Sequence, residues 1–111
     1  MKEIKKDLSS IGEFGLIEEY IAPEFKDLVK EHMTGIGDDC SIIPISKTTS
    51  HIFTTDMLIE KTHFLRDKIT PYQLGFKSLA VNLSDIAAMG GIPVGSYISI
   101  GLPKDIELSW I

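Results

Sequence analysis

The chain has 111 residues, which leaves room for one domain with a modest hydrophobic core. Hydrophobic residues make up 43% and charged residues 24%, a balance that is typical of globular proteins and excludes a disordered chain. The net charge is −5 and no basic cluster exceeds Lys5 and Lys6, so we expect no nucleic-acid partner, because phosphate backbones are bound mainly by Lys and Arg.

Two further properties concern the cellular compartment. Cys40 is the one cysteine, so an internal disulfide is excluded. The first ten residues are charged without a following apolar run, and no segment approaches the length that spans a membrane. We therefore expect a cytoplasmic protein with no membrane contact.

The first half of the chain predicts a helix and a hairpin. Apolar residues over 16–21 recur at helical spacing, and we expect this helix to end before Pro23. Residues 24–32 are charged and predicted to lie at the surface, and Gly35 and Gly37 indicate a turn. Residues 40–45 and 51–57 are rich in strand formers, with a hairpin loop expected over 47–50.

The second half predicts a long helix over 72–89, begun by Pro71 and ended by Gly90, Gly91 and Pro93. Residues 94–102 alternate loosely and suggest a third strand, and a further helical pattern begins at Pro103. The elements together predict an α+β fold. Because Trp110 and Ile111 fall one turn into the last pattern, we expect the chain to be part of a longer protein.

Aspartates placed within apolar stretches are the most informative residues. A carboxylate among residues that favour burial is costly unless a positive group neutralises it. The aspartates concerned are Asp38, Asp39, Asp56 and Asp85. No Lys or Arg is adjacent to any of these four in sequence. A hard divalent cation such as Mg²⁺ would supply the missing charge, because it prefers oxygen ligands and bridges carboxylates to phosphates.

The long helix gives Asp85 a direction. Ser78, Asn82 and Asp85 fall within about 60° of one another around the helix axis. The opposite side is broad and apolar, so we expect the helix to be mostly buried and its polar stripe to face a polar site. Capping or helix–helix hydrogen bonding is the alternative, above all for Ser78 and Asn82.

The other two acidic segments are more ambiguous taken singly. Gly-Asp-Asp also forms ordinary turns, and on a regular strand Asp38 and Asp39 would point to opposite faces, so one of them, Asp39, is the expected ligand. Thr54 and Asp56 would share a strand face, with Thr55 pointing away unless the strand ends there. Plain strand propensity is the alternative for both threonines, but Asp is disfavoured in strands.

His63 and Lys77 are secondary candidates. A lone histidine is usually structural or solvated, and His63 differs from His32 and His51 only in lying a few residues beyond Asp56. Lys77 is expected to be solvated, with a phosphate contact as the alternative. The phosphate-binding motifs G-x-x-x-x-G-K-[ST] and G-x-G-x-x-G are absent, as are zinc spacings and a nucleophile elbow. We expect no protein nucleophile or general base, which suits metal-assisted phosphoryl transfer.

Four motifs carry a resemblance to a known family. They are Gly-Glu-Phe-x-Leu-Ile at 12–17, Gly-Ile-Gly-Asp-Asp-Cys at 35–40, Thr-Thr-Asp-x-Leu-Ile-Glu-x-x-His-Phe at 54–64, and Lys-x-Leu-Ala-Val-Asn-Leu-Ser-Asp-Ile-Ala-Ala-Met-Gly at 77–90. In order and spacing the chain resembles thiamine-monophosphate kinases. The last motif is similar across the wider superfamily of aminoimidazole-ribonucleotide synthetase and selenophosphate synthetase.

The resemblance implies ATP-dependent phosphorylation of thiamine monophosphate to thiamine diphosphate. It also implies several Mg²⁺ ions and a homodimer in which N-terminal domains, each a mixed or antiparallel sheet packed with helices, pair their sheets. By the same resemblance, a substrate contact falls on His63, and the metal-binding positions are Asp39, Thr54, Thr55, Asp56 and Asp85. Asp38, Asn82 and Lys77 are weaker candidates.

Two departures from the family pattern matter. Lys61 stands where members often have Gly, so the loop before His63 is expected to sit differently. Members also continue well beyond residue 111, so we expect residues 1–111 to be an incomplete Mg-ATP-binding domain, inactive alone. The alternatives are a related superfamily enzyme with another substrate and a non-catalytic dimerisation or metal-binding module.

Overall fold

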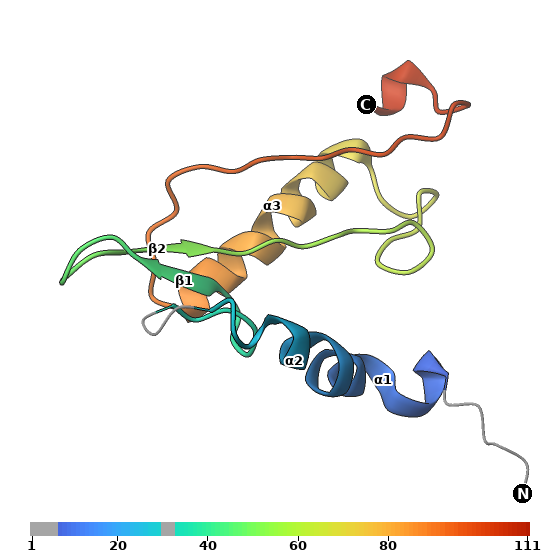
Figure 1. Cartoon of the computed structure of the whole chain (residues 1–111). Coiled ribbons are helices and arrows are strands. Elements are labelled where there is room, and N and C mark those ends of the chain that lie inside the picture. Colours follow the sequence, from blue (N-terminus) through green and yellow to red (C-terminus); the bar gives the residue numbers. More distant parts are fainter. Residues whose placement is uncertain (1–6, 30–32) are drawn as a thin grey trace, which may run out of the picture.

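The structure of the chain is a computed structural model that describes residues 7–29 and 33–111. It is an α+β arrangement in which a two-stranded hairpin lies near a long helix, α3, with a shorter helical segment at the N-terminal side (Figure 1). The predicted α+β class is therefore confirmed at this level, whereas a larger sheet is not present in the described residues.

The N-terminal helical segment joins three pieces: α1 (Leu8–Leu16), the π-helical η1 (Ile17–Ile21) and α2 (Ala22–Phe25). Asp7 caps α1, its carboxylate accepting a hydrogen bond from the Ser10 backbone N–H at 3.2 Å. Hydrogen bonding by Ser9 lowers the pKa of the Asp7 carboxyl below its ordinary value. Gly12, at φ 66°, interrupts α1 with a kink that glycine tolerates.

The expectation that this helix ends before Pro23 is wrong, because the helical segment passes through Pro23 to Phe25. In η1 the Ala22 N–H donates to the Ile17 carbonyl five residues back, so the regular ladder is already shifted when the chain reaches the proline. Pro23 then stands at the start of α2, where its missing N–H costs no helical bond.

The predicted hairpin is confirmed. β1 (Ser41–Pro44) and β2 (Ser50–Phe53) pair antiparallel, with Ile42 opposite Ile52. The second strand is shorter than the predicted 51–57. Its last residue, Phe53, pairs with Ser41, and the chain before Ser41 bends away over 36–40, so the residues after Phe53 have no strand beside them.

The long helix is confirmed as α3 (Pro71–Ala88). A capping box begins it: the Gln73 N–H donates to the Thr70 hydroxyl at 3.2 Å, and the Thr70 N–H donates to the Gln73 side chain at 2.9 Å. Gly90, at φ 65°, ends it; its N–H donates to the Ala87 carbonyl and that of Gly91 to the Ile86 carbonyl.

The expected burial of α3 is wrong for the described part of the chain. No residue of α3 is buried, and Phe76 on its apolar side is 70% exposed. The third strand predicted over 94–102 is also wrong: this segment runs extended and exposed, without a strand partner (Figure 1). The last helical pattern is reduced to a single 3₁₀ turn, η2 (Leu108–Trp110).

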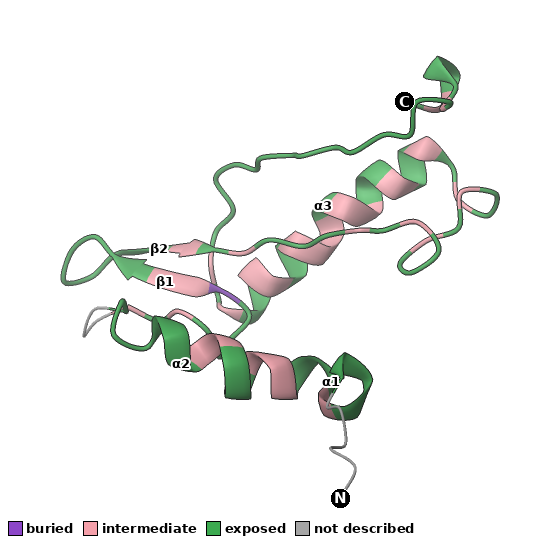
Figure 2. Cartoon of the chain, turned by 45° about the vertical axis from the view of Figure 1, so that its right-hand side comes forward, coloured by how far each residue is buried: buried purple, intermediate pink, exposed green. Residues whose placement is uncertain are grey.

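Cys40 is the one buried residue among those described, with 2% of its surface exposed. Figure 2 shows it as the short buried stretch immediately before β1. Among the described residues, burial is therefore deepest where the hairpin begins, and several of the candidate residues lie around the same point.

Candidate functional site

A hollow opens at the end of the hairpin where β1 begins and β2 ends. Since Ser41 pairs with Phe53, the residues before β1 and after β2 emerge at the same edge of the sheet. The chain lines this hollow with Asp38, Asp39, Cys40, Ser41, Phe53, Thr54 and Thr55. Four residues predicted from the sequence as candidate ligands thus meet in one place, and we call it the carboxylate hollow.

Asp85 reaches the same place from α3. The Thr54 hydroxyl donates a hydrogen bond to the Asp85 carboxylate, with 2.5 Å between the two oxygens. Both side chains are half-buried, and 31 residues separate them in sequence. Hydrogen bonds to a charged acceptor are short and strong, so this contact fixes the end of β2 against α3.

The pKa of the Cys40 thiol is affected by its burial and by the carboxylates around it. Burial raises the pKa of Cys40 above its ordinary value, and the negative charges of Asp85, Asp39 and Asp38 raise that pKa further. The acidic side chains therefore share one electrostatic environment at this point of the fold. From the sequence, Cys40 indicated only that an internal disulfide is excluded. The acid pair directly before it, Asp38 and Asp39, was the signal that could have marked Cys40 as part of the site.

Asp38 and Asp39 behave differently, because the Asp38 carboxylate accepts a hydrogen bond from the Asp39 backbone N–H at 2.9 Å. This contact belongs to the bend that precedes β1 and occupies one oxygen of Asp38. Asp39 is exposed in the same hollow.

Asp56 does not line the carboxylate hollow. It follows the hollow's threonines but lies beyond the end of β2 and is exposed. Within residues 7–29 and 33–111, no three His, Cys, Asp or Glu side chains come close enough to hold a metal ion among themselves. A cation here would need the threonine oxygens, water or a bound phosphate as additional ligands, which is how Mg²⁺ is commonly held.

The donor set nevertheless fits a hard cation. The hollow presents two carboxylates and two threonines, with Asp85 joined to it through Thr54. All of these offer oxygen. Burial raises the pKa of Cys40, and the negative charges of Asp85, Asp39 and Asp38 raise it further. An excess of negative charge with oxygen donors is the environment that Mg²⁺ stabilises.

The polar stripe of α3 is only partly directed at this site. Asn82 donates from its amide to the Ser78 carbonyl at 2.9 Å, and the Ser78 hydroxyl donates to the Gly75 carbonyl at 2.9 Å. Both side chains thus bond to backbone carbonyls of their own helix, which is neither the capping nor the helix–helix hydrogen bonding named as the alternative.

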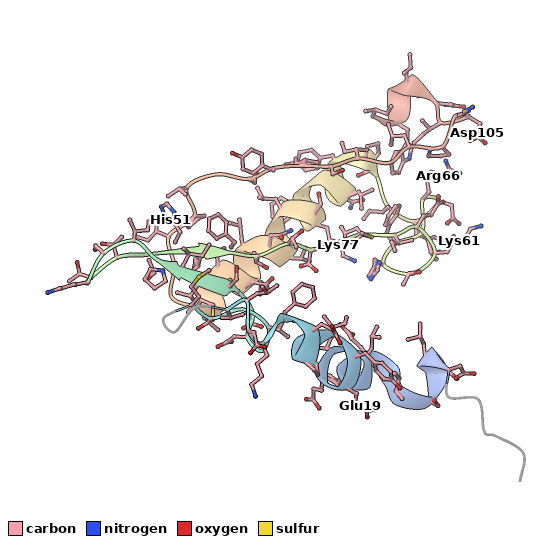
Figure 3. The ribbon with its side chains drawn as sticks, in the orientation of Figure 1. Glu19, His51, Lys61, Arg66, Lys77 and Asp105 are labelled. Carbon is pink, nitrogen blue, oxygen red and sulfur yellow. The ribbon has the colours of Figure 1, made fainter. Side chains whose placement is uncertain are left out.

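His63 and Lys77 meet at a second hollow, between the loop after β2 and the first half of α3. Its lining consists of His63, Phe64, Leu65, Lys68, Ile69, Gln73 and Lys77. The Lys77 ammonium donates to the His63 carbonyl at 2.7 Å. Figure 3 shows Lys77 on α3 beside the segment that leads to Lys61. The sequence did not indicate that Lys68 and Gln73 line this second hollow, because the path of the loop before α3 determines their position.

The backbone of the loop that carries His63 has an unusual angle at Lys61, the position where the chain departs from the family pattern. Lys61 has φ 68°, in the left-handed region that favours glycine. Its N–H donates to the Phe64 carbonyl at 2.7 Å, which holds the turn closed. The loop therefore keeps a backbone shape suited to Gly, with Lys in its place.

Among the helices of the described residues, none is both long enough and apolar enough to cross a bilayer.

The chain was compared with known proteins. It is 46% identical over 99 residues to the thiamine-monophosphate kinase of Buchnera aphidicola subsp. Acyrthosiphon pisum, a match that covers 89% of this chain and 30% of that protein. The thiamine-monophosphate kinase of Aquifex aeolicus is 40% identical over 107 residues, covering 94% of this chain and 31% of that protein. That of Escherichia coli K12 is 40% identical over 100 residues, covering 90% and 30%.

The chain thus spans less than a third of the length of these relatives. No solved structure matched it. The family model described as AIR synthase related protein, N-terminal domain, matches residues 37–111, which include the carboxylate hollow, the hairpin and α3. Because that match covers well over half of the chain, the chain belongs to the family of AIR synthase related proteins, whose N-terminal domain it carries.

Proposed function

We propose that the chain is the N-terminal, Mg-ATP-binding part of a thiamine-monophosphate kinase, which transfers the γ-phosphoryl group of ATP to thiamine monophosphate. The observation that carries the proposal is the gathering of oxygen donors at one edge of the hairpin, with Asp85 joined to them by Thr54. Relatives that are 40% and 46% identical over most of this chain bear that name.

In this proposal Asp39, Thr55 and Asp85 hold Mg²⁺ together with Asp56, and Thr54 keeps Asp85 in place as well as offering its own oxygen. Bound Mg²⁺ would neutralise the charge on two phosphate groups that otherwise repel each other. Asp38 holds the backbone of Asp39 through its hydrogen bond, so that the Asp39 carboxylate keeps a fixed origin at the bend.

The exposed position of Asp56 is compatible with this role. It follows Thr55 directly, at the point where β2 has ended and the chain is no longer confined by pairing. A ligand at the rim can approach a cation from the solvent side, where phosphates and water complete the coordination.

The reaction needs no nucleophile from the protein. An oxygen of the thiamine monophosphate phosphate, already anionic, forms a bond to the γ-phosphorus, and the bond from that phosphorus to the β,γ-bridging oxygen breaks. ADP leaves with the electron pair, and thiamine diphosphate is the product. The residues of this chain position the two phosphates and stabilise their charge, which is most of what phosphoryl transfer requires.

Several further features belong to the same proposal. The active protein would be a cytoplasmic homodimer, in which sheets of two N-terminal domains pair, and residues 1–111 would be an incomplete catalytic unit, inactive alone. The match to less than a third of each relative supports the incomplete unit, because the remaining length would supply other contacts to ATP and thiamine monophosphate.

The test uses the full-length protein, meaning the product of the complete reading frame that contains this chain. We expect it to form thiamine diphosphate and ADP in equal amounts from thiamine monophosphate and ATP, measured by chromatography. Asp85→Asn and Asp56→Asn should each reduce kcat about 100-fold or more, because each removes a charge from the phosphate-clamping site. Their circular dichroism spectra should match that of the parent.

Asp105→Asn is the matched control, since Asp105 is exposed and lies near the C-terminal turn, away from the hairpin (Figure 3). It should retain the kcat of the parent. Retained turnover in Asp85→Asn or Asp56→Asn would overturn the shared metal site. An active protein that phosphorylates another acceptor and ignores thiamine monophosphate would point to a different member of the family.

A further inference from the structure

The loop between β2 and α3 is braced at several points around His63. The Ile59 backbone N–H donates to the His63 ring nitrogen Nδ1 at 2.9 Å. The same loop is closed by the hydrogen bond from the Lys61 N–H to the Phe64 carbonyl. Arg66 forms an ion pair with Glu60 across it at 3.3 Å. His63 is therefore held by its ring as well as by its backbone.

The contact with Ile59 determines where the imidazole carries its proton. A ring nitrogen that accepts a hydrogen bond from a backbone N–H has no proton of its own, so Nδ1 is the acceptor. The proton of the neutral imidazole then sits on Nε2. His63 is among the residues that line the second hollow, so an Nε2–H turned into that hollow would be a hydrogen-bond donor to a ligand there.

Lys77 fixes the same residue from α3. Its ammonium donates to the His63 carbonyl at 2.7 Å, a charge-assisted bond that spans 14 residues of sequence. This bond joins the loop to the second turn of a capped helix. A shift of the His63 peptide would move the ring and lengthen the Ile59 contact, so the two bonds depend on each other.

We propose that Lys77 is a positioning residue: it holds His63 so that Nδ1 stays on the Ile59 N–H and the Nε2–H is presented to an acceptor atom of the bound thiamine monophosphate. The proposal rests on the proposed function for the identity of that ligand. It assigns the Lys77 ammonium to the His63 carbonyl and gives it no direct contact with phosphate.

The first measurement tests the Nε2–H donor of the His63 ring while the hydrogen bond that holds the loop is kept. In the full-length protein, His63→Asn keeps an acceptor, the amide oxygen, near the position of Nδ1 but removes the Nε2–H. We expect KM for thiamine monophosphate to rise about tenfold, the cost of one lost hydrogen bond, with KM for ATP unchanged.

The second measurement tests whether Lys77 affects substrate binding through His63. Lys77→Met should raise KM for thiamine monophosphate about tenfold and leave KM for ATP within about twofold, whereas Lys77→Arg, which can still donate to the carbonyl, should recover most of the loss. In a double-mutant cycle, Lys77→Met should add nothing to His63→Asn, since both act through one ring. Lys47→Met, in the exposed hairpin loop, is the matched control and should leave both KM values unchanged.

The third measurement does not depend on turnover. Nitrogen-15 NMR of histidine-labelled full-length protein should show His63 as the Nε2–H tautomer without substrate, its signal assigned by loss in His63→Asn. In Lys77→Met both tautomers should be populated. This arm keeps the two proposals distinguishable: a parent that does not phosphorylate thiamine monophosphate refutes the proposed function, while the tautomer still tests the role of Lys77.

Four outcomes would overturn the positioning role. A proton found on Nδ1 in the parent would remove its basis, and an unchanged tautomer in Lys77→Met would show that Lys77 does not act on the ring. Multiplied losses in the double variant would show that Lys77 has its own contact with substrate. A raised KM for ATP in Lys77→Met would assign that contact to the nucleotide.

Discussion

At the scale of single residues, Lys61 combines an unfavourable backbone angle with a place near the proposed substrate contact. Its φ of 68° costs a residue with a side chain roughly 1–2 kcal/mol. Lys61→Gly should therefore stabilise the loop by about 1 kcal/mol, partly offset by the greater freedom of glycine in the unfolded chain. The melting temperature of the full-length protein, followed by calorimetry, should rise by a few degrees.

Lys47→Gly is the control for this change. Lys47 is exposed in the hairpin loop and is not among the described residues with positive φ, so glycine there should leave the melting temperature unchanged or lower it. Equal effects of the two substitutions would contradict a strained backbone at Lys61.

The residues of the carboxylate hollow show how far single positions could be predicted. The family resemblance implied that Asp39, Thr54 and Asp85 are metal-binding positions, and the structure places Asp39 and Thr54 in one hollow with Asp85 bonded to Thr54. The hydrogen bond between Thr54 and Asp85 was not predictable, because it depends on where β2 ends. β2 ends at Phe53 because the chain before its partner Ser41 bends away, and this property of the strand pairing cannot be read from residues 54–56.

At the scale of elements, the turn that follows α3 approaches the hairpin closely at Gly91. A Cβ added to Gly91 would overlap Ile52 Cδ1 of β2 and would lie 3.2 Å from Ile86 Cγ2 of α3. Gly91→Ala should therefore destabilise the full-length protein by about 1–3 kcal/mol, the usual range for overpacking. Ile52→Val, which removes the overlapping carbon, should recover much of that loss in the double variant, as measured by thermal melting.

Gly101→Ala provides the matched control, because a Cβ at Gly101 meets nothing within 4 Å. It should leave the melting temperature unchanged. If Gly91→Ala proved equally silent, or if Ile52→Val failed to relieve its effect, the close approach of the turn after α3 to β2 would be disproved.

Elements with local signals were the predictable ones. Pro71 and the glycines after Met89 mark the two ends of α3 in the sequence, and the helix predicted over 72–89 is observed as Pro71–Ala88. The segment 94–102 has the composition of a strand, yet it forms none, because a strand exists only beside a partner. For the same reason, apolar periodicity indicated a buried face on α3 but could not indicate what would cover it.

At the scale of the whole molecule, the described chain is extended and has almost no core. Its radius of gyration is 18.3 Å, whereas a compact domain of this length has about 13 Å. Cys40 is the one buried residue among those described, while Val94 is 96% and Phe76 70% exposed. So much exposed apolar surface is seldom stable in water without a covering partner.

The isolated 111-residue chain should therefore lack a stable tertiary structure of its own. Too little apolar area is buried to offset the conformational entropy of folding, so we expect a broad thermal transition by near-ultraviolet circular dichroism. The exposed face of α3 and residues 92–102 should bind the dye ANS strongly, and the full-length protein should bind it weakly at equal concentration. A sharp, cooperative transition in a chain that sediments as a monomer and binds little dye would show that residues 1–111 bury a core by themselves. In that case folding would not require a partner that covers the exposed apolar surface, and α3 would pack differently from the arrangement in Figure 1.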